Sequence, residues 1–526
     1  VSTLRLPNDV SLSESSKRFL PSGNRHSGKD LMNPFDNRPI KVSGLLSVDR
    51  DLLVVAEQPI HLTDSHLSVG GDVHIESRLS RINFPTKSVD VLNRDKRLSA
   101  IQIDNVRGQF SGDLGLVSRS GSVGRSVTGL SVFDSDLSAD GDLHVSAKAS
   151  PNSPFSESTG IDLRSSNFNA DSIGLKGRGG SSSDQILNRG IDMDNTSLIA
   201  AQRISMVGKG GDGRKHVQGI VLRPKSTIKS LRADISIKGL GGDDAGIGLQ
   251  GLLIDSRGNL VAQSDLKLFG VAGSSRAPHH GSGIYIGNKT RLKADNVLIT
   301  GIGSDLTDST SRLPVKQKNQ LKWNSGVFIS PHTHIKTSGN LQIDGEGGYG
   351  HQFLDGVSIS GSYVVSKGDV SLFGMSGYGD TIQDSFGLYL EGTDIKAKNI
   401  WFTGFSSDDN EKVNTQLLDG IHLGNSNVVA KGFIDAFGQT GTSQNMTNSA
   451  GFYAFGSTLK AGSMWLLGKP GAYSQIDGRN SNQSGLTASD RESKIAGQSS
   501  GKNVGLWLKE STLRTSRGDL YLTGVG

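Results

Sequence analysis

The stretch Gly190-Ile191-Asp192-Met193, followed by Ser197-Leu198-Ile199-Ala200 and then by Ile204-Ser205-Met206-Val207-Gly208, decides the fold of this chain. The same three-part phrase runs from Gly160 to Gly177 and from Gly356 to Gly374. Its copies begin about every 30 residues, and a fixed period of this size is the signature of a solenoid. Within each part apolar and polar residues alternate, which predicts a short strand with one buried face.

Three such segments per copy, separated by short polar corners, predict an all-β fold. We expect a single-stranded parallel β-helix of about 15 coils, with about 30 residues and three short strands in each coil. The middle strand repeatedly carries a small residue such as Ala200, because a narrow coil has little room for large side chains. The glycine that closes each coil, such as Gly208, is expected where the corner needs a positive φ or a close backbone approach. The inward-facing side chains of one coil are then Ile191, Met193, Leu198, Ala200, Ile204 and Met206.

The first 38 residues lack this period and carry Pro7, Pro21 and Pro34 in a polar stretch. We interpret residues 1–38 as a lead-in or linker, or as a cap over the exposed strand edges of the first coil. Residues 39–526 then form the β-helix domain. Coil length varies mainly after the closing glycine, which predicts long corner loops at 302–325 and 469–504, either as ligand-binding loops or as neutral insertions. Because the chain opens at Val1, we expect a mature or excised segment of a longer protein.

Composition narrows the functional classes. The chain of 526 residues has 70 glycines, no cysteine and a formal net charge of +5 at pH 7. Acids and bases are interspersed, which is typical of a solvated surface and not of a nucleic-acid-binding site. No apolar run is long enough to span a bilayer. The lack of cysteine excludes disulfides; it fits chance depletion, or a chain that must cross an oxidising periplasm unfolded.

Aromatic residues recur at outward positions of the expected strands, where their rings would form a ladder. Such a ladder offers a platform for sugar rings or a partner protein, unless corner loops cover it as a second small core. In the loop 302–325, basic residues around a tryptophan favour an anionic glycan or an acidic protein patch, or simply a solvated loop. The candidate binding residues are Tyr285, Phe328, Tyr389, Tyr453 and Trp507 on first strands, Trp401, Trp465 and Tyr521 on third strands, and Lys316, Lys318, Lys322 and Trp323 in the loop.

Asp162 and Asp192 are the candidates for a catalytic pair, because they occupy the outward position of the first strand in neighbouring coils, about 5 Å apart. Paired carboxylates serve polysaccharide-degrading enzymes, but no His, Arg or Lys occupies the matching position to complete an acid–base set. His332 and His334 lack the cysteine or carboxylate neighbours of a metal site. We therefore predict a non-enzymatic protein with no catalytic residue, no metal and no cofactor.

The pattern G-h-x-h…s-x-h-x-A-x-G-x-h-x-h-x-G, in which h is apolar and s is small, is clearest at residues 136–145, 428–432 and 459–466. It resembles the passenger regions of filamentous haemagglutinin-like exoproteins, which are large adhesins exported by two-partner secretion in Gram-negative bacteria. The resemblance covers residues from about 40 to 526, and autotransporter passengers share the architecture. The family's secretion domain carries Asn-Pro-Asn motifs, to which Asn33-Pro34-Phe35 is the nearest match, so that domain is expected to be missing.

The resemblance implies a right-handed helix, secretion or display on the bacterial surface, an outer-membrane secretion partner, and a host glycan or protein as receptor. It assigns no site residue, because it lies in the scaffold. We therefore expect an adhesin that presents loops and an aromatic ladder. Capture of a haem-carrying host protein is the alternative within the family, and a polysaccharide lyase or hydrolase is the alternative from another class.

Overall fold

The computed structural model describes residues 3–5, 10–12, 40–57, 59–79, 98–120, 127–150, 157–181, 187–213, 215–243, 249–274, 281–305, 324–350, 352–379, 382, 384–406, 417–441, 449–470, 493–495, 504–516 and 518–525. The chain divides into two compact units, Val1–Asp243 (unit 1) and Asp244–Gly526 (unit 2), and each is described by itself. All regular elements of the described residues are β-strands. None of these residues belongs to a helix that could cross a membrane.

The prediction of an all-β parallel β-solenoid is confirmed. About 10 turns keep a regular spacing of roughly 31 residues. Other turns depart from this spacing: Ile40 pairs with Ile60 near the start, and Phe452 pairs with Leu506 across the long insertion of unit 2. The insertion lengthens the turn without disturbing the strand register on either side of it.

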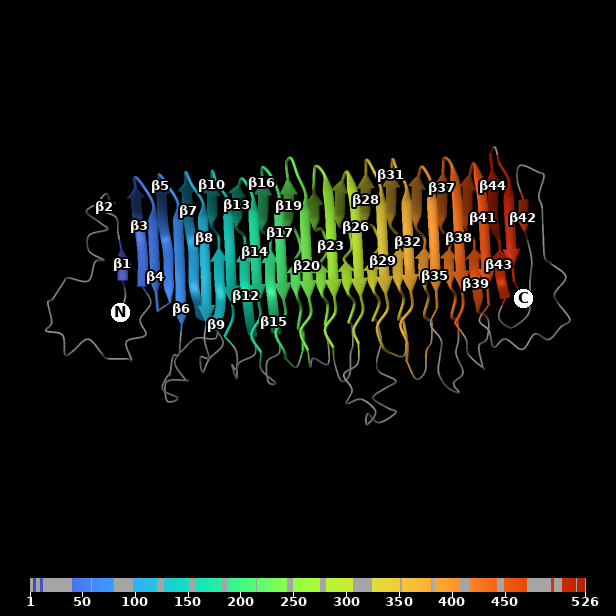
Figure 1. Cartoon of the computed structure of the whole chain (residues 1–526), viewed down its shortest axis with the longest axis horizontal. Helices are drawn as coiled ribbons and strands as arrows, with labels where there is room; N and C mark the ends of the chain where they lie inside the picture. Colours follow the sequence, from blue (N-terminus) through green and yellow to red (C-terminus); the bar gives the residue numbers. More distant parts are fainter. Residues whose placement is uncertain are drawn as a thin grey trace. The chain divides into compact units, whose positions relative to one another are not determined.

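In unit 1 the third strands of successive coils pair in parallel and lie side by side (Figure 1). In the earliest coils the first and second segments are joined in one long strand, which bends at Asp64 or Asn105 where φ is positive. The third strands are β4 (Leu52–Ala56), β6 (Val73–Leu79), β8 (Leu114–Ser120), β11 (Leu143–Lys148), β14 (Ile173–Arg178), β17 (Ile204–Lys209) and β20 (Ile235–Leu240). The long strands are β3 (Ile40–Val48), β5 (Ile60–Val69) and β7 (Leu98–Phe110). The later first strands are β9 (Val127–Phe133), β12 (Glu157–Arg164), β15 (Leu187–Asp194) and β18 (Ile220–Leu222), and the second strands are β10 (Asp136–Ala139), β13 (Asn167–Ala170), β16 (Ser197–Ala200) and β19 (Thr227–Ser230).

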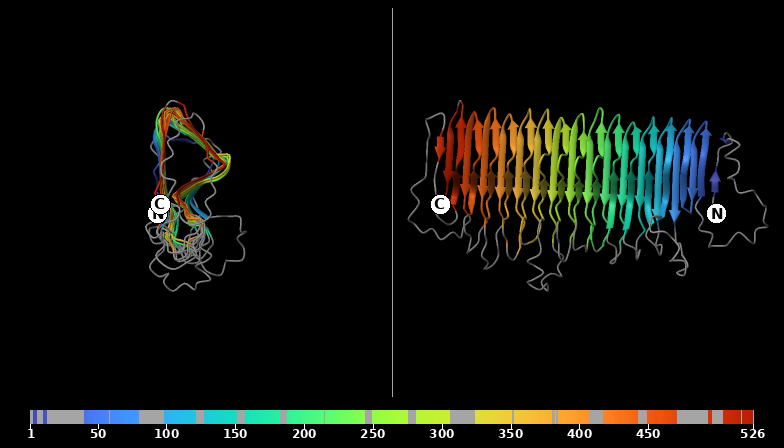
Figure 2. Two further views of the ribbon diagram at one scale, coloured as in Figure 1. Left: turned by 90° about the vertical axis from the view of Figure 1, so that its right-hand side faces the viewer. Right: turned by 180° about the vertical axis from the view of Figure 1, so that it is seen from behind.

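Unit 2 repeats the three-strand coil throughout. Within each unit, the coils overlie one another in the end view, with strand segments on three sides (Figure 2). The first strands are β21 (Leu252–Ile254), β24 (Ile284–Ile286), β27 (Val327–Ile329), β30 (Val357–Ser360), β33 (Leu388–Glu391), β36 (Ile421–Gly424), β39 (Ala450–Phe455) and β43 (Val504–Lys509). The second strands are β22 (Asn259–Val261), β25 (Arg291–Ala294), β28 (His334–Thr337), β31 (Tyr363–Ser366), β34 (Asp394–Ala397), β37 (Asn427–Ala430), β40 (Thr458–Ala461) and β44 (Ser511–Thr515). The third strands are β23 (Asp265–Val271), β26 (Asn296–Ile302), β29 (Leu341–Glu346), β32 (Val370–Met375), β35 (Ile400–Phe405), β38 (Phe433–Gln439), β41 (Ser463–Lys469) and β45 (Leu520–Gly524).

Short antiparallel strands cover part of the open sheet edges. β1 (Thr3–Arg5) pairs with β4, and β2 (Val10–Leu12) pairs with β3, the first long strand of unit 1. In unit 2, β42 (Ser493–Ile495), which comes from the insertion 469–504, pairs with β44. An uncovered edge is a template for pairing with another chain, so these strands protect the sheets.

The core is the axial column of aliphatic side chains that the alternation predicts. All six inward residues of the coil that begins at Gly190 are buried, and Ala200 at the small position is fully buried with them. The closing glycines hold a close backbone approach: a Cβ on Gly208 would lie 2.3 Å from the carbonyl oxygen of Gly219. Their φ is not positive, so only this half of the expectation holds. Positive φ occurs instead at the corner between first and second strands, for example at Asp134, Ser165 and Asn195.

A buried row of hydroxyl side chains follows this corner, and the sequence patterns above did not predict it. The Oγ of Ser166 accepts the backbone N–H of Ser135 in the preceding coil at 3.2 Å and donates to the carbonyl oxygen of Arg164 at 2.7 Å. Ser135 does the same for Val106 at 3.0 Å. In unit 2, Ser426, Ser457 and Ser511 accept the N–H groups of Thr393, Ser426 and Ser457. The row satisfies N–H groups that would otherwise be buried without a partner.

Candidate functional site

The candidate aromatic residues of unit 2 lie in two separate rows. The first row is on the outward side of the first strands, where Tyr285 stacks on Phe328 with centroids 5.3 Å apart and ring planes at 11°. Ser358 interrupts this row, and it resumes with Tyr389, His422, Tyr453 and Trp507 at centroid distances of 5.2, 4.8 and 5.2 Å. These rings are half-buried.

Part of the first row is covered from outside. This agrees with the alternative in which the rings are covered as a second small core. Phe386, which precedes the opening Gly387, is buried and packs on Tyr389 at 5.1 Å and on His422 at 4.8 Å. Leu354, Ile382 and Leu418, from three successive connections, form a small apolar cluster of their own. Hence the first row is a satellite core at least around Tyr389, and it is a poor platform for a large ligand.

Two buried carboxylates lie beneath this row. Asp419 accepts the N–H of Ala450 at 2.7 Å, and its other oxygen lies 2.8 Å from Nδ1 of His422. Asp355 accepts the N–H of Phe386 at 3.1 Å. Burial raises the pKa of both carboxyls, and that of Asp355 reaches about 7. The half-buried Tyr389 has its pKa raised to about 12, mainly by burial.

The second row lies on the outward side of the third strands and is more exposed. Trp401 meets Phe433 edge-on at 4.9 Å, Phe433 meets Trp465 edge-on at 5.9 Å, and Trp465 stacks on Tyr521 at 5.9 Å with ring planes 4° apart. Trp465 is 41% exposed and Tyr521 is 45% exposed. These two rings therefore stack on each other from neighbouring strands, and both remain partly exposed to solvent.

A third row, which the sequence pattern did not predict, runs beside the second. Phe373 packs on Phe405 at 6.0 Å, and Phe405 packs edge-on against Phe437 at 5.6 Å. Phe373 and the nearby Met375 are exposed. These residues occupy outward positions of the third strands, where the alternation leads one to expect polar residues. Large apolar residues at those positions were the available signal in the sequence. We call Met375, Phe373, Phe405, Phe437, Trp401, Phe433, Trp465 and Tyr521 the aromatic face.

Polar groups within the aromatic face are few and localised. Asp435 lies between Trp401 and Trp465 in the strand register, and burial raises the pKa of its carboxyl. The hydroxyl of Tyr521 donates to Asp519 at 3.1 Å. Flat apolar rings with acceptors beside them suit a ligand that offers an apolar face and hydroxyl groups at its edges.

The loop candidates Lys316, Lys318, Lys322 and Trp323 lie outside the described residues, so their part in a site stays a prediction. The described residues contain no group of three or more His, Asp or Glu side chains arranged to hold a metal ion.

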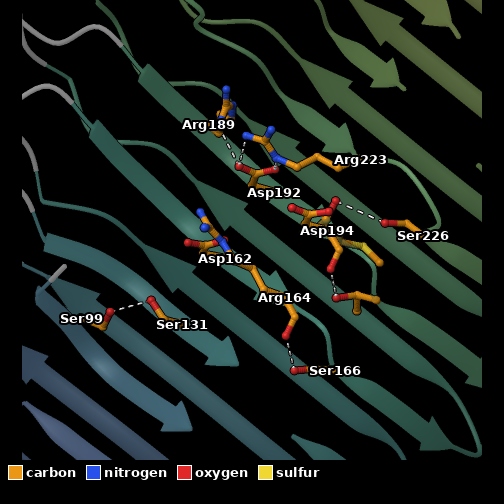
Figure 3. Close-up of polar contacts among 12 residues, drawn as sticks. Ser99, Ser131, Asp162, Arg164, Ser166, Arg189, Asp192, Asp194, Arg223 and Ser226 are labelled. Atoms are coloured by element: carbon orange, nitrogen blue, oxygen red, sulfur yellow. Dashed lines mark hydrogen bonds and ion pairs between the residues drawn. The ribbon is translucent and has the colours of Figure 1, made fainter. Parts of the chain in front are cut away.

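Asp162 and Asp192 are register partners in neighbouring coils, as expected, but the expectation that they lack basic neighbours is wrong. Both carboxylates are buried, and each is bound by arginine (Figure 3). Arg164 Nε lies 2.9 Å from Asp162; Arg189 Nη1 and Arg223 Nε lie 2.7 and 2.8 Å from Asp192. Arg189, at the start of β15, is three residues before Asp192 and is not related to it by strand alternation. Arg223 comes from the following coil, two residues after Val221, which is the register partner of Asp192.

The electrostatics of this cluster are those of a structural ion-pair network. Burial by itself would raise the pKa of Asp192, but the charges of Arg189 and Arg223 outweigh it and lower that pKa. A carboxylate held ionised and enclosed by guanidinium groups is a poor general acid or base. The geometry thus gives Asp162 and Asp192 a role in folding.

Known proteins do not extend this description. No protein-family model matches the sequence, and no curated protein matches it either.

Proposed function

We propose that this protein is a non-enzymatic adhesin that binds carbohydrate chains on the aromatic face of unit 2. The observation that carries the proposal is the stacked, partly exposed pair Trp465 and Tyr521. Soluble proteins rarely expose a contiguous set of large apolar rings unless the surface binds something. A rigid sheet holds these rings in place, so little conformational entropy is lost when a ligand is bound.

The shape of the face favours sugar rings over a protein partner. A pyranose ring has a flat face of C–H groups that packs on an aromatic ring, and hydroxyl groups around its edge. Asp435 and Asp519 lie beside the rings and offer acceptors for such hydroxyls. The parallel rings of Trp465 and Tyr521 accept flat groups, whereas a protein interface core is built from interdigitating side chains.

The biological setting is part of the proposal and is supported by resemblance alone. The likeness to filamentous haemagglutinin-like exoproteins is consistent with secretion to, or display on, a Gram-negative cell surface through an outer-membrane partner. The receptor would then be a glycan of a host cell. The chain has no cysteine, which agrees with export through an oxidising compartment.

A glycan array with the full chain, followed by calorimetry on the best ligand, tests the proposal. Trp465→Ala and Tyr521→Ala are each expected to weaken binding at least tenfold, which corresponds to about 1.4 kcal/mol. Tyr363→Ala is the matched control, because Tyr363 is 44% exposed and stacks on His334 on a different sheet face. Equal losses in all three variants, or no glycan binding at all, would contradict the proposal.

The same proteins also separate glycan binding from the two alternative functions. Binding of a haem-carrying host protein by the full chain, unaffected by Trp465→Ala, would favour capture of that protein instead. Release of shorter sugars from a bound polysaccharide would favour an enzyme. Because Asp162 and Asp192 are structural, a loss of activity in their variants counts only where the variant is shown to be folded.

A further inference from the structure

A continuous row of basic side chains crosses the third-strand sheet of unit 1. Strand pairing places Arg78 next to Arg119, Arg119 next to Lys148, Lys148 next to Arg178, and Arg178 next to Lys209. All five side chains are exposed. They stand on adjacent strands about 4.8 Å apart. We call them the basic row.

The basic row carries a net positive charge that the described residues only partly offset. Glu76 lies 2.7 Å from Arg78 and 3.6 Å from Arg119, at one end of the row. At the other end, no acidic side chain of the described residues forms an ion pair with Arg178 or Lys209. Like charges directly opposite each other on neighbouring strands destabilise a sheet. The neighbouring charges of Arg178 and Lys209 are therefore costly to the sheet, and an anionic ligand would lower that cost.

A groove borders the basic row on the same sheet face. It has a volume of about 620 Å³. On the side of the row it is lined by Val117, Ser146, Lys176 and Val207, each two residues from the row along its strand, and Asp72 and Asp113 line it just before β6 and β8. Along the floor of the groove, histidine and glycine alternate from one coil to the next. A Cβ on Gly115 would lie 3.1 Å from Nδ1 of His74, and one on Gly174 would lie 3.1 Å from Nδ1 of His144. The imidazole rings thus lie close to the glycines of the next coil. The groove crosses several strands in the same direction as the basic row.

We propose that this face of unit 1 binds a linear acidic polysaccharide, with its chain in the groove and its carboxylate or sulfate groups on the basic row. The positive charge of the basic row favours an anionic ligand. Because the row repeats at strand spacing, it favours a polymer with regularly placed charges. Lys176, Ser146 and the two histidines supply hydrogen bonds to the sugar. The site is independent of the aromatic face, because it lies in the other unit and recognises charge.

A nucleic acid is the other linear polyanion, and the groove is less suited to it. Proteins that bind single strands stack the bases on aromatic side chains beside a basic channel. Among the described residues, none that lines the groove is Phe, Tyr or Trp. Histidine, serine, glycine and valine suit a hydroxylated, non-planar chain better than stacked bases.

Binding of dextran sulfate and polygalacturonate to the full chain tests this proposal, with neutral dextran and a single-stranded oligonucleotide as comparators. The double variant Arg178→Ser/Lys209→Ser is expected to lose at least tenfold in affinity for both acidic polysaccharides. The slope of log Kd against log salt concentration should also fall by roughly 1 to 2, as expected for two lost ion contacts. Neutral dextran is expected not to bind at this face.

The control is Lys229→Ser/Arg232→Ser, which removes one Lys and one Arg that are exposed elsewhere in unit 1. It changes net charge by the same amount and should leave the affinity unchanged. An equal loss in the control would show attraction by overall charge and overturn the proposal. Tighter binding of the oligonucleotide than of either polysaccharide, lost in the first variant, would overturn the assignment to polysaccharide.

Discussion

Trp465 of β41 and Tyr521 of β45 lie directly opposite each other on neighbouring parallel strands, with ring centroids 5.9 Å apart and ring planes 4° apart. They are 56 positions apart in the chain, and the long insertion between them contributes nothing to their spacing. The sheet sets that spacing. A stacked pair of this kind, on the solvent side of a rigid sheet, is the basis of the proposed glycan-binding face.

The aromatic face should contribute little to folding. Trp465→Ala is expected to change the free energy of unfolding by less than about 1 kcal/mol, because the side chain is 41% exposed and lies outside the axial column. Phe402→Ala on the inward side of the same sheet should cost about 3 to 5 kcal/mol, because Phe402 is fully buried in the axial column. Urea denaturation of the two variants checks this. Similar losses in both would mean that the aromatic face is part of the core.

The buried hydroxyl row should be essential for coil stacking. Ser166→Ala leaves the buried N–H of Ser135 without its acceptor, and we expect a loss of about 1 to 3 kcal/mol of unfolding free energy. Ser146→Ala, at an exposed site on β11, is the matched control and should change stability by less than about 0.5 kcal/mol. Chemical denaturation measures both. Equal stability of the two variants would show that water replaces the serine hydroxyl.

Asp355 should make unit 2 less stable as pH rises through the range from about 4 to about 7. In this window the unfolded carboxyl is ionised, while burial raises the pKa of the native carboxyl to about 7, so the native state holds the extra proton. The free energy of unfolding therefore falls with rising pH and levels off above the native pKa. The lost stability is on the order of 4 kcal/mol for a shift of this size.

The variant Asp355→Asn isolates this effect, because the amide oxygen can still accept the N–H of Phe386 but carries no charge at any pH. Denaturation of both proteins at pH 5 and pH 8 is the measurement. The variant should gain stability relative to the native protein on going from pH 5 to pH 8. A constant difference between the two proteins would mean that Asp355 has an ordinary pKa.

Arg223 should stabilise unit 1 through Asp192. Arg223→Met keeps the aliphatic stem but removes two hydrogen bonds of 2.8 and 3.0 Å to a buried carboxylate. We expect a loss of about 2 to 4 kcal/mol, since Arg189 still holds Asp192 ionised. The double variant Arg223→Met/Asp192→Asn should recover part of that loss, because it removes the buried charge. Thermal and urea denaturation measure the stability of both variants. No recovery of stability in the double variant would mean that Arg223 and Asp192 are not coupled.

The sequence predicted the parts of the fold that depend on local alternation. Apolar residues recur at alternate strand positions in each coil, as Ile191, Met193 and Leu198 do in one of them. Burial of these residues on one face of the strand follows directly from that pattern. The small position at Ala200 was predictable for the same reason. Handedness rests on resemblance and stays a prediction.

The missed features depend on register between coils. Arg178 and Lys209 are 31 residues apart in the chain, so the basic row is dispersed in the sequence and looks like an ordinary solvated surface. Each follows a closing glycine directly, and this shared position was the available signal. The pairing of Arg189 with Asp192 was hidden in another way, because the two residues are three positions apart in β15 and strand alternation does not relate them.

A structure of the full chain bound to the glycan selected on the array tests the central claim most directly. The account predicts sugar rings parallel to the rings of Trp465 and Tyr521, with hydroxyl groups near Asp435 or Asp519. Sugar bound instead on the first-strand row around Tyr389, or in the loop 302–325 with the aromatic face empty, would contradict it.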